Sequence, residues 1–547
     1  MSDTTDYFIE KFRRNLEVAD ESPRYFRPRP YRNAAVRFRK CSIDDFEKRR
    51  DILVNEAGLN AFLFRADMIP GCDLLSDSGT TTMTMEQWAA MMLGDESYGS
   101  NEGYFELING IEDVFGTGWV DTSFSMGGYS DSLFLFHQGR AAENAFFTIL
   151  ARELRKLPEV PVPVLSDGLM PELKERIQSK LDSLPERRRS VDESMFIIPS
   201  NSHFDTTQGN IEDKRMIPLN LPCREHLEKN EDFLFRGNMD LEELENLLAV
   251  EKERVPLVYL TITNNTGGGQ PVSMDNIRKI REITARYGIP FFFDACRFAE
   301  NAWFIRKNEQ GYSDKPIKAI VHEMFSQVDG FHISLKKDGL ANMGGALVIR
   351  KDGSFYKKFP HIREGFTDYQ IMAEGHPTYG GLPGRDLKAI SEGLRTVTHL
   401  DYLDARIGQV VRFGLKLSES GIPIINPVGG HAVYIDVDKF FGGTAEDEDF
   451  KGIAFTGLML IAGHRVCELG LYAFGSYDGK TETPPSPRVN YIRAAVPRLA
   501  YEDRDLFSVV EAARILADNR DRIPAVEVKY GRDLSLRHFK SRFGFKG

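Results

Sequence analysis

The sequence predicts an α/β protein with a mostly parallel sheet and a second, smaller domain. Apolar strands alternate with amphipathic helices between about residues 255 and 350, as parallel strands require, because each pair needs a crossover helix. After about Ser391 the pattern becomes helical and then mixed, which favours a second domain. The chain of 547 residues is also longer than one compact core of ordinary size can accommodate.

The clearest strand–helix–strand unit lies in the middle of the chain. An apolar strand at Leu257–Thr263 is followed by a Gly-rich turn and by a helix that opens at Ser273. Gly288 closes this helix, and Ile289–Phe293 enters the next strand. The helix carries three isoleucines on one face: Ile277, Ile280 and Ile283. Because such crossovers in parallel sheets are right-handed, we expect a right-handed βαβ unit here.

Other segments complete the expected domain plan. Helical patterns cover Met83–Leu93 and Ala141–Leu157, and further strands are expected at Gly330–Ile333, Gly345–Arg350 and Ala432–Val437. We predict an N-terminal arm over residues 1–40, a small domain made of residues 41–80 and 396–547, and a large domain over residues 81–395. Two insertions, at about 117–130 and 158–195, interrupt the large domain.

Composition and charge exclude several classes of protein. With 41% hydrophobic and 28% charged residues the chain is globular, and a net charge of -11 gives no basic surface for nucleic acid. Neither a secretory signal nor an apolar stretch of transmembrane length is found, so no membrane partner is expected. Five widely spaced cysteines, without a Cys-x-x-Cys pair, predict reduced thiols and a cytoplasmic location.

Three polar side chains follow consecutive expected strands. Asn265 and Asp294 end two of them, and Lys337 follows a third. Ligands of open α/β sheets bind beyond the carboxyl ends of the strands, and an acid, an amide and a lysine there suit a cofactor with a pyridine ring. Taken singly, each has a plainer interpretation: the double lysine could be solvated, and Asp294 could cap a helix at Ala295–Trp303.

A phosphate cradle is indicated at the start of the second helical segment. The residues Gln138, Gly139 and Arg140 directly precede it, and Ser334 could add a hydroxyl donor. Phe204, in a polar loop, offers an aromatic face to a cofactor ring. Alone, the first group could be an ordinary turn and Phe204 a core residue.

Four longer motifs carry a resemblance to a known family. The stretches 263–273, 294–302, 334–345 and 377–382 resemble those of the tryptophanase and tyrosine phenol-lyase family of β-eliminating lyases, and the likeness extends from about Leu75 to His538. It implies pyridoxal 5'-phosphate (PLP) as cofactor and fold type I, the aminotransferase-like fold. That fold has a mostly parallel seven-stranded sheet in the large domain and a smaller α+β domain. The resemblance also implies a homotetramer whose active sites lie between subunits.

The resemblance assigns roles around the cofactor residue by residue. Lys337 matches the Schiff-base lysine, with Lys336 its neighbour, and Asp294 matches the partner of the ring nitrogen. Arg297 and Asn265 match residues near the phenolate oxygen. The remaining matches are the phosphate ligands and the stacking ring: Gln138, Gly139, Arg140, Ser334 and Phe204.

It also assigns substrate and cation residues. Tyr98 matches the tyrosine that delivers a proton to the leaving group, reaching into a neighbouring subunit's site. Arg493 matches the arginine that binds the substrate α-carboxylate, and Ser78 is a further substrate contact. The family requires a monovalent cation, potassium by preference, and the matching ligand positions are Glu96 through its carboxylate and, through their carbonyls, Gly79 and Asn342.

Four positions bear on the leaving group. Leu469 stands where the phenol-lyases carry an arginine, which argues against tyrosine, and Asp205 and His538 agree with tryptophanases. His376 departs from both, since tryptophanases have phenylalanine there and phenol-lyases methionine. The resemblance thus implies a tryptophan indole-lyase, which makes indole, pyruvate and ammonia from L-tryptophan and water.

Several alternatives stay open. Another reaction of the family would be elimination from tyrosine or from another β-substituted amino acid, such as a cysteine thioether or a modified aromatic. An aminotransferase would use the same fold for a different reaction. A non-catalytic scaffold would have no need of Lys337, Asp294, Arg140 and Arg493 together.

Overall fold

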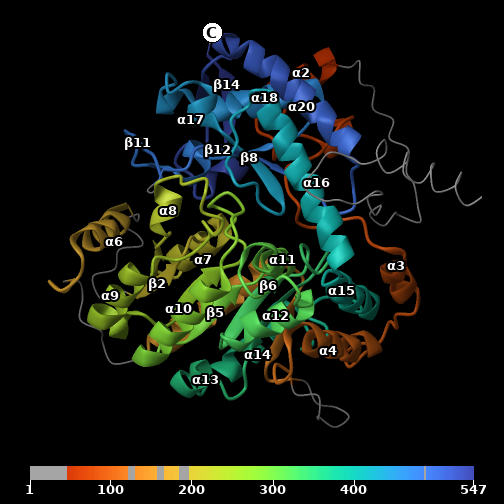
Figure 1. Ribbon diagram of the computed structural model, residues 1–547, viewed down its shortest axis with the longest axis vertical. Helices are drawn as coiled ribbons and strands as arrows, with labels where there is room; N and C mark the ends of the chain where they lie inside the picture. Colours follow the sequence, from red (N-terminus) through yellow and green to blue (C-terminus); the bar gives the residue numbers. More distant parts are fainter. Residues whose placement is uncertain (1–45, 121–129, 157–164, 184–195, 486–487, 547) are drawn as a thin grey trace, which may run out of the picture.

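The structure is a computed structural model that describes residues 46–120, 130–156, 165–183, 196–485 and 488–546. The arm predicted for residues 1–40 lies outside these ranges, as do residues 121–129 of the first predicted insertion. The second insertion is described only in part and contains helix α6 (Pro171–Ser183). Figure 1 shows two bodies, one above the other, with the long helix α16 (Leu400–Glu419) running from the upper to the lower.

The lower body is built on the expected sheet. Five strands are hydrogen-bonded in the order β1-β7-β6-β5-β4, in which β4, β5 and β6 are parallel and β7 is antiparallel to both its neighbours. A parallel pair, β2 and β3, lies beyond β4. Asn201, directly after β2, connects the pair to β4: its side chain donates to the Thr261 carbonyl and accepts from the Thr261 amide. The seven strands are β1 (Leu133–Phe136), β2 (Ile197–Ser200), β3 (Ile217–Asn220), β4 (Val258–Thr261), β5 (Phe291–Asp294), β6 (Gly330–Ser334) and β7 (Gly345–Ile349).

Helices cover both faces of this sheet. Because strand side chains alternate, Phe291 and Phe293 enter the core on one face and Phe292 enters the core on the other. The helices of this body are α3 (Met85–Met92), α4 (Glu102–Phe115), α5 (Gly139–Leu154), α7 (Asp205–Asp213), α8 (Arg224–Leu227), α9 (Leu241–Glu251), α10 (Met274–Tyr287), α11 (Phe298–Asn308), α12 (Ile317–Ser326), α13 (Ser354–Lys358), α14 (Ile362–Ala373) and α15 (Gly384–Thr396).

Local sequence signals explain where the central elements begin and end. Helix α10 starts after Ser273, whose side chain accepts from the Asn276 amide at 3.1 Å, and it ends at Gly288 with a φ of 68°. Both signals are as predicted. The helix expected from Ala295 begins instead at Phe298, after Arg297. Asp294 therefore ends β5 and does not cap a helix, so that plainer interpretation was wrong.

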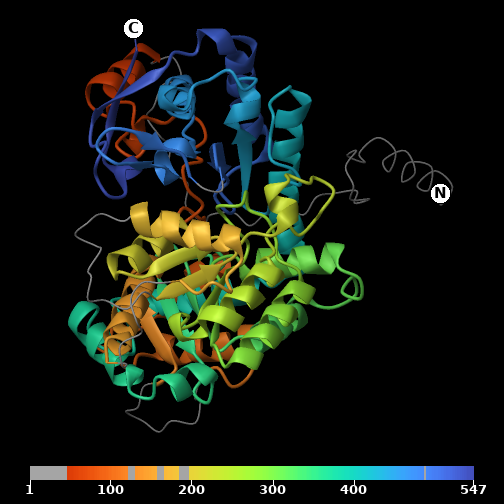
Figure 2. The same cartoon turned by 90° about the vertical axis from the view of Figure 1, so that its left-hand side faces the viewer.

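The upper body has a three-stranded antiparallel sheet, ordered β8-β12-β9. Its core combines residues between 53 and 74 with residues between 410 and 543, and Figure 2 shows the red N-terminal helix α2 among the blue C-terminal segments. Its remaining elements are α2 (Phe46–Asn55), β8 (Ala432–Asp436), α17 (Val437–Phe440), α18 (Lys451–Ala462), β9 (Cys467–Leu469), α19 (Leu471–Phe474), β10 (Ser476–Tyr477), β11 (Glu482–Thr483), β12 (Tyr491–Ala495), α20 (Asp503–Asp518), β13 (Val526–Tyr530) and β14 (Arg542–Phe545).

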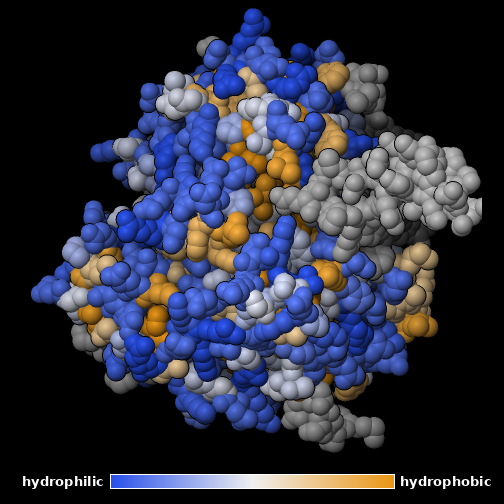
Figure 3. All heavy atoms as spheres, viewed as in Figure 1, coloured by the Kyte–Doolittle hydropathy of each residue, from blue (hydrophilic) through white to orange (hydrophobic). Residues whose placement is uncertain are grey.

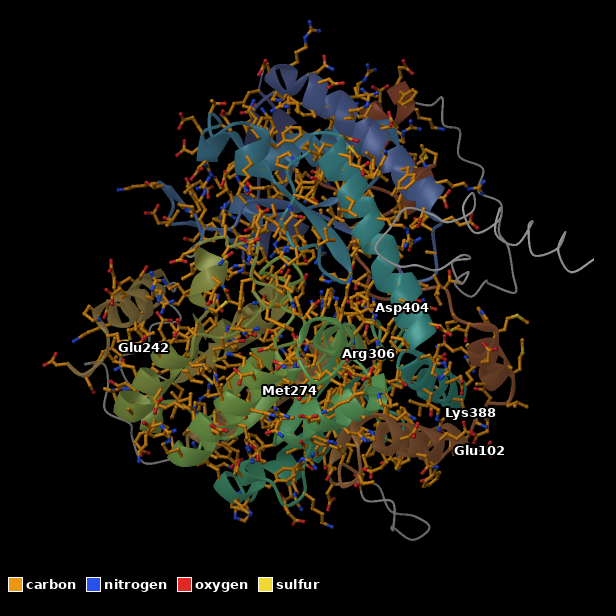
Figure 4. All side chains as sticks on the ribbon, in the orientation of Figure 1. Glu102, Glu242, Met274, Arg306, Lys388 and Asp404 are labelled. Carbon is orange, nitrogen blue, oxygen red and sulfur yellow. The ribbon has the colours of Figure 1, made fainter. Side chains whose placement is uncertain are left out.

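The two bodies meet along α16 and α11. Trp303 Nε1 on α11 donates to Asp404 Oδ1 on α16 at 2.8 Å, and Figure 4 labels Asp404 and Arg306 where these helices approach each other. None of the described helices is both long and apolar enough to cross a bilayer.

Candidate active site

A buried carboxylate and a lysine converge at the ends of β5 and β6. Asp294 ends β5 with 4% of its surface exposed, and Lys337 follows Ser334 at the end of β6. Burial works to raise the pKa of Asp294, but the positive charges of His332 and Lys337 outweigh it and lower that pKa. An ionised carboxylate thus lies near the loop that carries Lys336 and Lys337, which we call the lysine loop.

Arg140 lies in the first turn of α5, and Lys336 and Lys337 follow Ser334 at the end of β6. Burial and the positive charges of Lys337 and Arg140 lower the pKa of Lys336. Gly139, the first residue of α5, packs so closely that a Cβ there would lie 2.5 Å from Ser334 Cβ. The helix start, the serine and the cations together form a site suited to a phosphate group. Gln138, half-buried, precedes this helix start.

A buried histidine supports Asp294 from within the sheet. His332 Nε2 on β6 lies 3.0 Å from Glu143 Oε1 and 3.5 Å from Asp294 Oδ1, and its ring stacks on that of Tyr259. Burial opposes protonation, yet the two carboxylates raise the pKa of His332 well above its usual value. The sequence interpretation missed this residue, although a histidine inside an otherwise apolar strand was a visible signal.

Glu143 extends this arrangement to two helices. It lies on α5, and its carboxylate accepts hydrogen bonds at 3.0 Å from the hydroxyls of Thr206 and Thr207 on α7. The helix that begins at the phosphate cradle and the helix that begins after Phe204 therefore share one buried carboxylate. Phe204 itself is half-buried and belongs to none of the core clusters.

Asn265 and Arg493 meet at the junction of the two bodies. Arg493 Nη1 lies 3.5 Å from Asn265 Oδ1, which also accepts from the Tyr434 hydroxyl at 2.5 Å. Arg493 Nη2 donates to the Leu75 carbonyl at 3.0 Å. Within the part of the chain that the structure describes, its buried Nε atom has no hydrogen-bond partner. A buried guanidinium with an open donor is suited to an incoming carboxylate.

Arg297 is held by an acid that the sequence interpretation did not single out. Its Nε and Nη2 atoms donate to the two carboxylate oxygens of Asp77 at 3.0 and 2.8 Å, and both residues are buried. Asp77 directly precedes Ser78 and Gly79, so the substrate and cation positions of that loop are tied to the turn after β5. Asn342 Nδ2 donates to the Gly79 carbonyl at 3.1 Å.

Three of the four residues expected to decide the leaving group are connected to one another, while His376 lies elsewhere, beside Tyr98. Asp205 Oδ2 lies 3.2 Å from His538 Nε2, and both side chains are buried. Burial opposes it, but interaction with His538 lowers the pKa of Asp205. The Phe62 ring packs edge-on against His538, with centroids 5.7 Å apart, and also packs against the apolar cluster that contains Leu469. Phe62 thus connects the Asp205–His538 pair with the cluster that contains Leu469.

A second group of expected site residues lies on the surface. Tyr98 is 80% exposed, and its ring centroid lies 5.9 Å from that of His376. Glu96, also exposed, is ion-paired with Arg385. Three apolar side chains of α3 and of the residue that follows it are also exposed, namely Met85, Met92 and Leu93. Figure 3 shows hydrophobic atoms where Figure 1 places α3.

The side chains at the ends of β5 and β6 and at the start of α5 fit PLP. The helix start and the cations near it suit its phosphate, the ionised carboxylate of Asp294 suits its ring nitrogen, and the amine of Lys337 suits its aldehyde. The open Nε of Arg493 leaves a donor for an amino-acid carboxylate.

Comparison with known proteins gives a consistent result. The profile of the family described as beta-eliminating lyase matches residues 73–158 and 183–512. A tryptophanase of Hyphomonas neptunium is 36% identical over 91% of this chain and 95% of its own length. A tyrosine phenol-lyase of Clostridium tetani is 33% identical over 91% and 94%.

Solved structures agree in fold. A serine palmitoyltransferase from S. paucimobilis, with a PLP–myriocin aldimine bound, superposes with a TM-score of 0.51 at 11% identity. The match covers 87% of this chain and 98% of that one. The aminotransferase-like fold type I expected from the sequence is thereby confirmed.

Proposed function

This chain belongs to the beta-eliminating lyases, which makes it a PLP-dependent lyase, and on that premise we propose that it cleaves L-tryptophan with water to indole, pyruvate and ammonia. The observation that carries the substrate is the buried Asp205–His538 pair, 3.2 Å apart, beside the apolar cluster of Leu469. The pair offers polar groups to the indole nitrogen, and the cluster offers hydrocarbon to the rest of the ring.

The cofactor is held by residues of the large domain. Lys337 would bind it covalently, Asp294 would pair with its ring nitrogen, and Gln138, Gly139, Arg140, Ser334 and Lys336 would hold its phosphate. Phe204 would stack on its ring, and Arg297 and Asn265 would lie near its ring oxygen. When bound, the cofactor accepts the electron pair left behind as the Cα–H bond of the substrate breaks.

The chain's own groups supply binding and proton transfer. Arg493 binds the substrate carboxylate through its open donor, with Ser78 beside it, and so orients the Cα–H bond. The Lys337 amine would take the α-proton of the bound substrate. Tyr98 delivers a proton to the leaving ring carbon from a neighbouring subunit, and Asp205 with His538 positions the indole.

One observation supports a second candidate substrate. His376 presents an imidazole next to the Tyr98 ring, where an indole pocket would present hydrocarbon. A substrate with a polar ring substituent or a cysteine thioether would suit this group better than an unsubstituted indole would. Elimination from tyrosine is less well supported, because Leu469 offers no charge to a phenol oxygen.

We further propose a cytoplasmic homotetramer that uses potassium. The exposed position of Tyr98 supports an assembly in which a second chain completes the site. Four buried cysteines are free thiols, which supports a reducing compartment. Gly79 and Asn342 lie together as two potassium positions, and Glu96 would come from another subunit.

Replacing Lys337 by Ala tests the cofactor assignment. Lys337→Ala should abolish turnover, and borohydride reduction of the wild type followed by peptide mass spectrometry should place the cofactor on the peptide that contains Lys337. Lys336→Ala is the matched control: it removes a neighbouring cation, so it should weaken cofactor binding yet retain turnover at saturating PLP. Wild-type pyruvate formation by Lys337→Ala would overturn the assignment.

A substrate panel tests the leaving group. The holoenzyme with potassium is incubated with tryptophan, tyrosine, an S-alkylcysteine and ring-hydroxylated tryptophan, and pyruvate and each leaving group are measured. We expect the highest kcat/KM for tryptophan, with indole and pyruvate in equal amounts. Pyruvate from the non-aromatic substrate alone would refute the indole assignment.

A further inference from the structure

One buried arginine joins the segments that carry the proposed site. The Arg498 side chain is 0% exposed and follows β12, the strand that holds Arg493. Its Nη2 donates to Glu300 Oε1 at 2.7 Å and to Asp338 Oδ1 at 2.8 Å. Its Nη1 donates to Asp77 Oδ2 at 2.9 Å. A single guanidinium therefore holds carboxylates from three separate segments.

Each of these carboxylates is close to a proposed site residue. Asp338 directly follows Lys337, and its other oxygen accepts from the Ala299 amide at 2.9 Å, at the start of α11. Asp77 directly precedes Ser78 and binds Arg297. Arg498 thus fixes three segments relative to one another: the lysine loop (residues 335–342), the loop that carries Ser78 (residues 76–82, the substrate loop) and the turn after β5 (residues 295–297).

The backbone adds two connections to the same arrangement. The Arg498 carbonyl accepts from the Thr82 amide at 3.1 Å, and the Gly79 amide donates to the Lys336 carbonyl at 2.8 Å. The substrate loop therefore touches both the arginine segment and the lysine loop. These bonds would survive a side-chain substitution, so Arg498 variants would perturb the loops without detaching them.

The charges in this network balance. Three guanidiniums, those of Arg297, Arg406 and Arg498, face three carboxylates, those of Asp77, Glu300 and Asp338, and all six residues are buried. A buried cluster of this kind adds little net stability, but removing one member leaves an opposite charge uncompensated. What such a cluster does provide is one specific arrangement of its members.

We propose that Arg498 is a positioning residue. It fixes the positions of the Lys337 amine and of the loop that carries Ser78 relative to Arg493, which binds the carboxylate. This inference rests on the proposed function for its catalytic consequence only, since the tie between the loops exists without substrate. Its effect comes from the planar fork of the guanidinium, which contacts three carboxylates at once. A lysine ammonium keeps the charge but not this geometry.

Two variants separate positioning from simple stability. Arg498→Lys keeps the positive charge and is the main test, and Arg498→Met removes the charge. The matched control is Arg406→Lys, because Arg406 lies in the same buried network but, among the described residues, reaches only Glu300, at 3.4 Å, and the His431 carbonyl, at 3.5 Å. Both arginine-to-lysine changes remove a buried guanidinium, but only one releases the lysine and substrate loops.

Hydrogen exchange of the holoenzyme without substrate is the first readout. Arg498→Lys should raise amide exchange by on the order of tenfold in residues 76–82 and 335–342, with smaller changes elsewhere, because local opening there becomes easier. Arg406→Lys should leave exchange in those segments at the wild-type rate. Wild-type exchange in both loops of Arg498→Lys would overturn the proposal, even if Arg498→Met failed to fold.

Steady-state kinetics is the second readout. Arg498→Lys should lower kcat by about tenfold to a hundredfold, as misplacement of reacting groups does. KM should change less, because Arg493 itself is intact. An equal loss in Arg406→Lys would overturn the proposal. If the wild type eliminates no amino acid, the exchange result still decides the positioning role, and only the proposed function fails.

Discussion

The proposed site has a buried part and an exposed part, and the two differ in how the chain organises them. Asp294 ends β5, Lys337 follows β6, Arg493 lies within β12 and Asp205 begins α7. Asp294, Arg493 and Asp205 are buried and in contact with other charged or polar groups. Tyr98 lies on the surface, 80% exposed. The chain's own fold fixes the first part, while the second is presented outward.

The exposed part has the character of a contact surface. A few residues before Tyr98 in the sequence, Met92 is 83% exposed and Leu93 73% exposed. Large apolar side chains that cluster on a surface mark interaction sites. This contrast supports a site that is completed by another chain, and it can be tested by placing one defect in each part.

The largest effect is expected from mixing two inactive variants. Lys337→Ala removes the lysine and Tyr98→Phe removes the exposed proton donor, so each alone should be inactive or nearly so. If the two parts of a site come from different chains, reassembly of an equal mixture creates some sites with both groups intact. Random assembly should restore about a quarter of wild-type activity, measured as pyruvate release after denaturation and refolding together.

One further mixture and the separate variants serve as controls for this experiment. Lys337→Ala mixed with Asp294→Ala places both defects in the buried part, so no intact site can form and activity should stay at the background level. Each variant refolded alone controls for recovery. Background activity in the Lys337→Ala and Tyr98→Phe mixture would place both groups in the site of one chain.

A smaller effect, on stability, is expected from His332→Gln. His332 lies between Glu143 and Asp294, and removal of a buried charged partner costs about 3 kcal/mol of the free energy of unfolding. Tyr98→Phe, on the exposed part, should change it by less than about 0.5 kcal/mol. Denaturant unfolding of the apoprotein at pH 6 measures both, and equal costs would contradict the contrast between the two parts.

The pH dependence of this loss follows from the two pKa shifts. Although burial opposes both, the folded protein raises the pKa of His332 above 6.5 and lowers that of Asp294 below 3.8. The histidine's contribution is complete below pH 6.5 and is lost as pH rises through its raised value. The aspartate's contribution is complete above pH 3.8 and is lost as pH falls through its lowered value. The gap between wild type and His332→Gln should therefore be widest between pH 3.8 and 6.5.

Local features of the fold could be predicted from the sequence because their causes are local. The Ser273 cap and the Gly288 end of α10 are encoded within that segment, and both were confirmed. The alternation of apolar strands and helices likewise indicated β4, β5 and β6. The sequence points to Asp294 and Lys337 as candidates because one ends and the other follows such a strand, and their position at the same edge depends only on the parallel order of those strands.

Contacts between distant segments could not be predicted in this way. Asp77 and Arg498 are separated by 421 positions, and Glu143 and Thr206 by 63. No periodicity in either segment indicates these pairings, because they arise only when elements far apart in the sequence pack together in the folded chain. His332 is intermediate: its strand was predicted, but its charged neighbours come from other elements.

The smallest effect is expected from His376→Phe, which changes the polarity of the exposed part. If tryptophan is the substrate, a phenylalanine beside Tyr98 should suit the indole better and lower KM for tryptophan by about threefold, with kcat nearly unchanged. His361→Phe, which makes the same change at an exposed position before α14, should leave both constants unaltered. A tenfold fall in kcat/KM for His376→Phe would instead show that the imidazole contacts the substrate, and it would favour the polar ring-substituted amino acids over tryptophan itself.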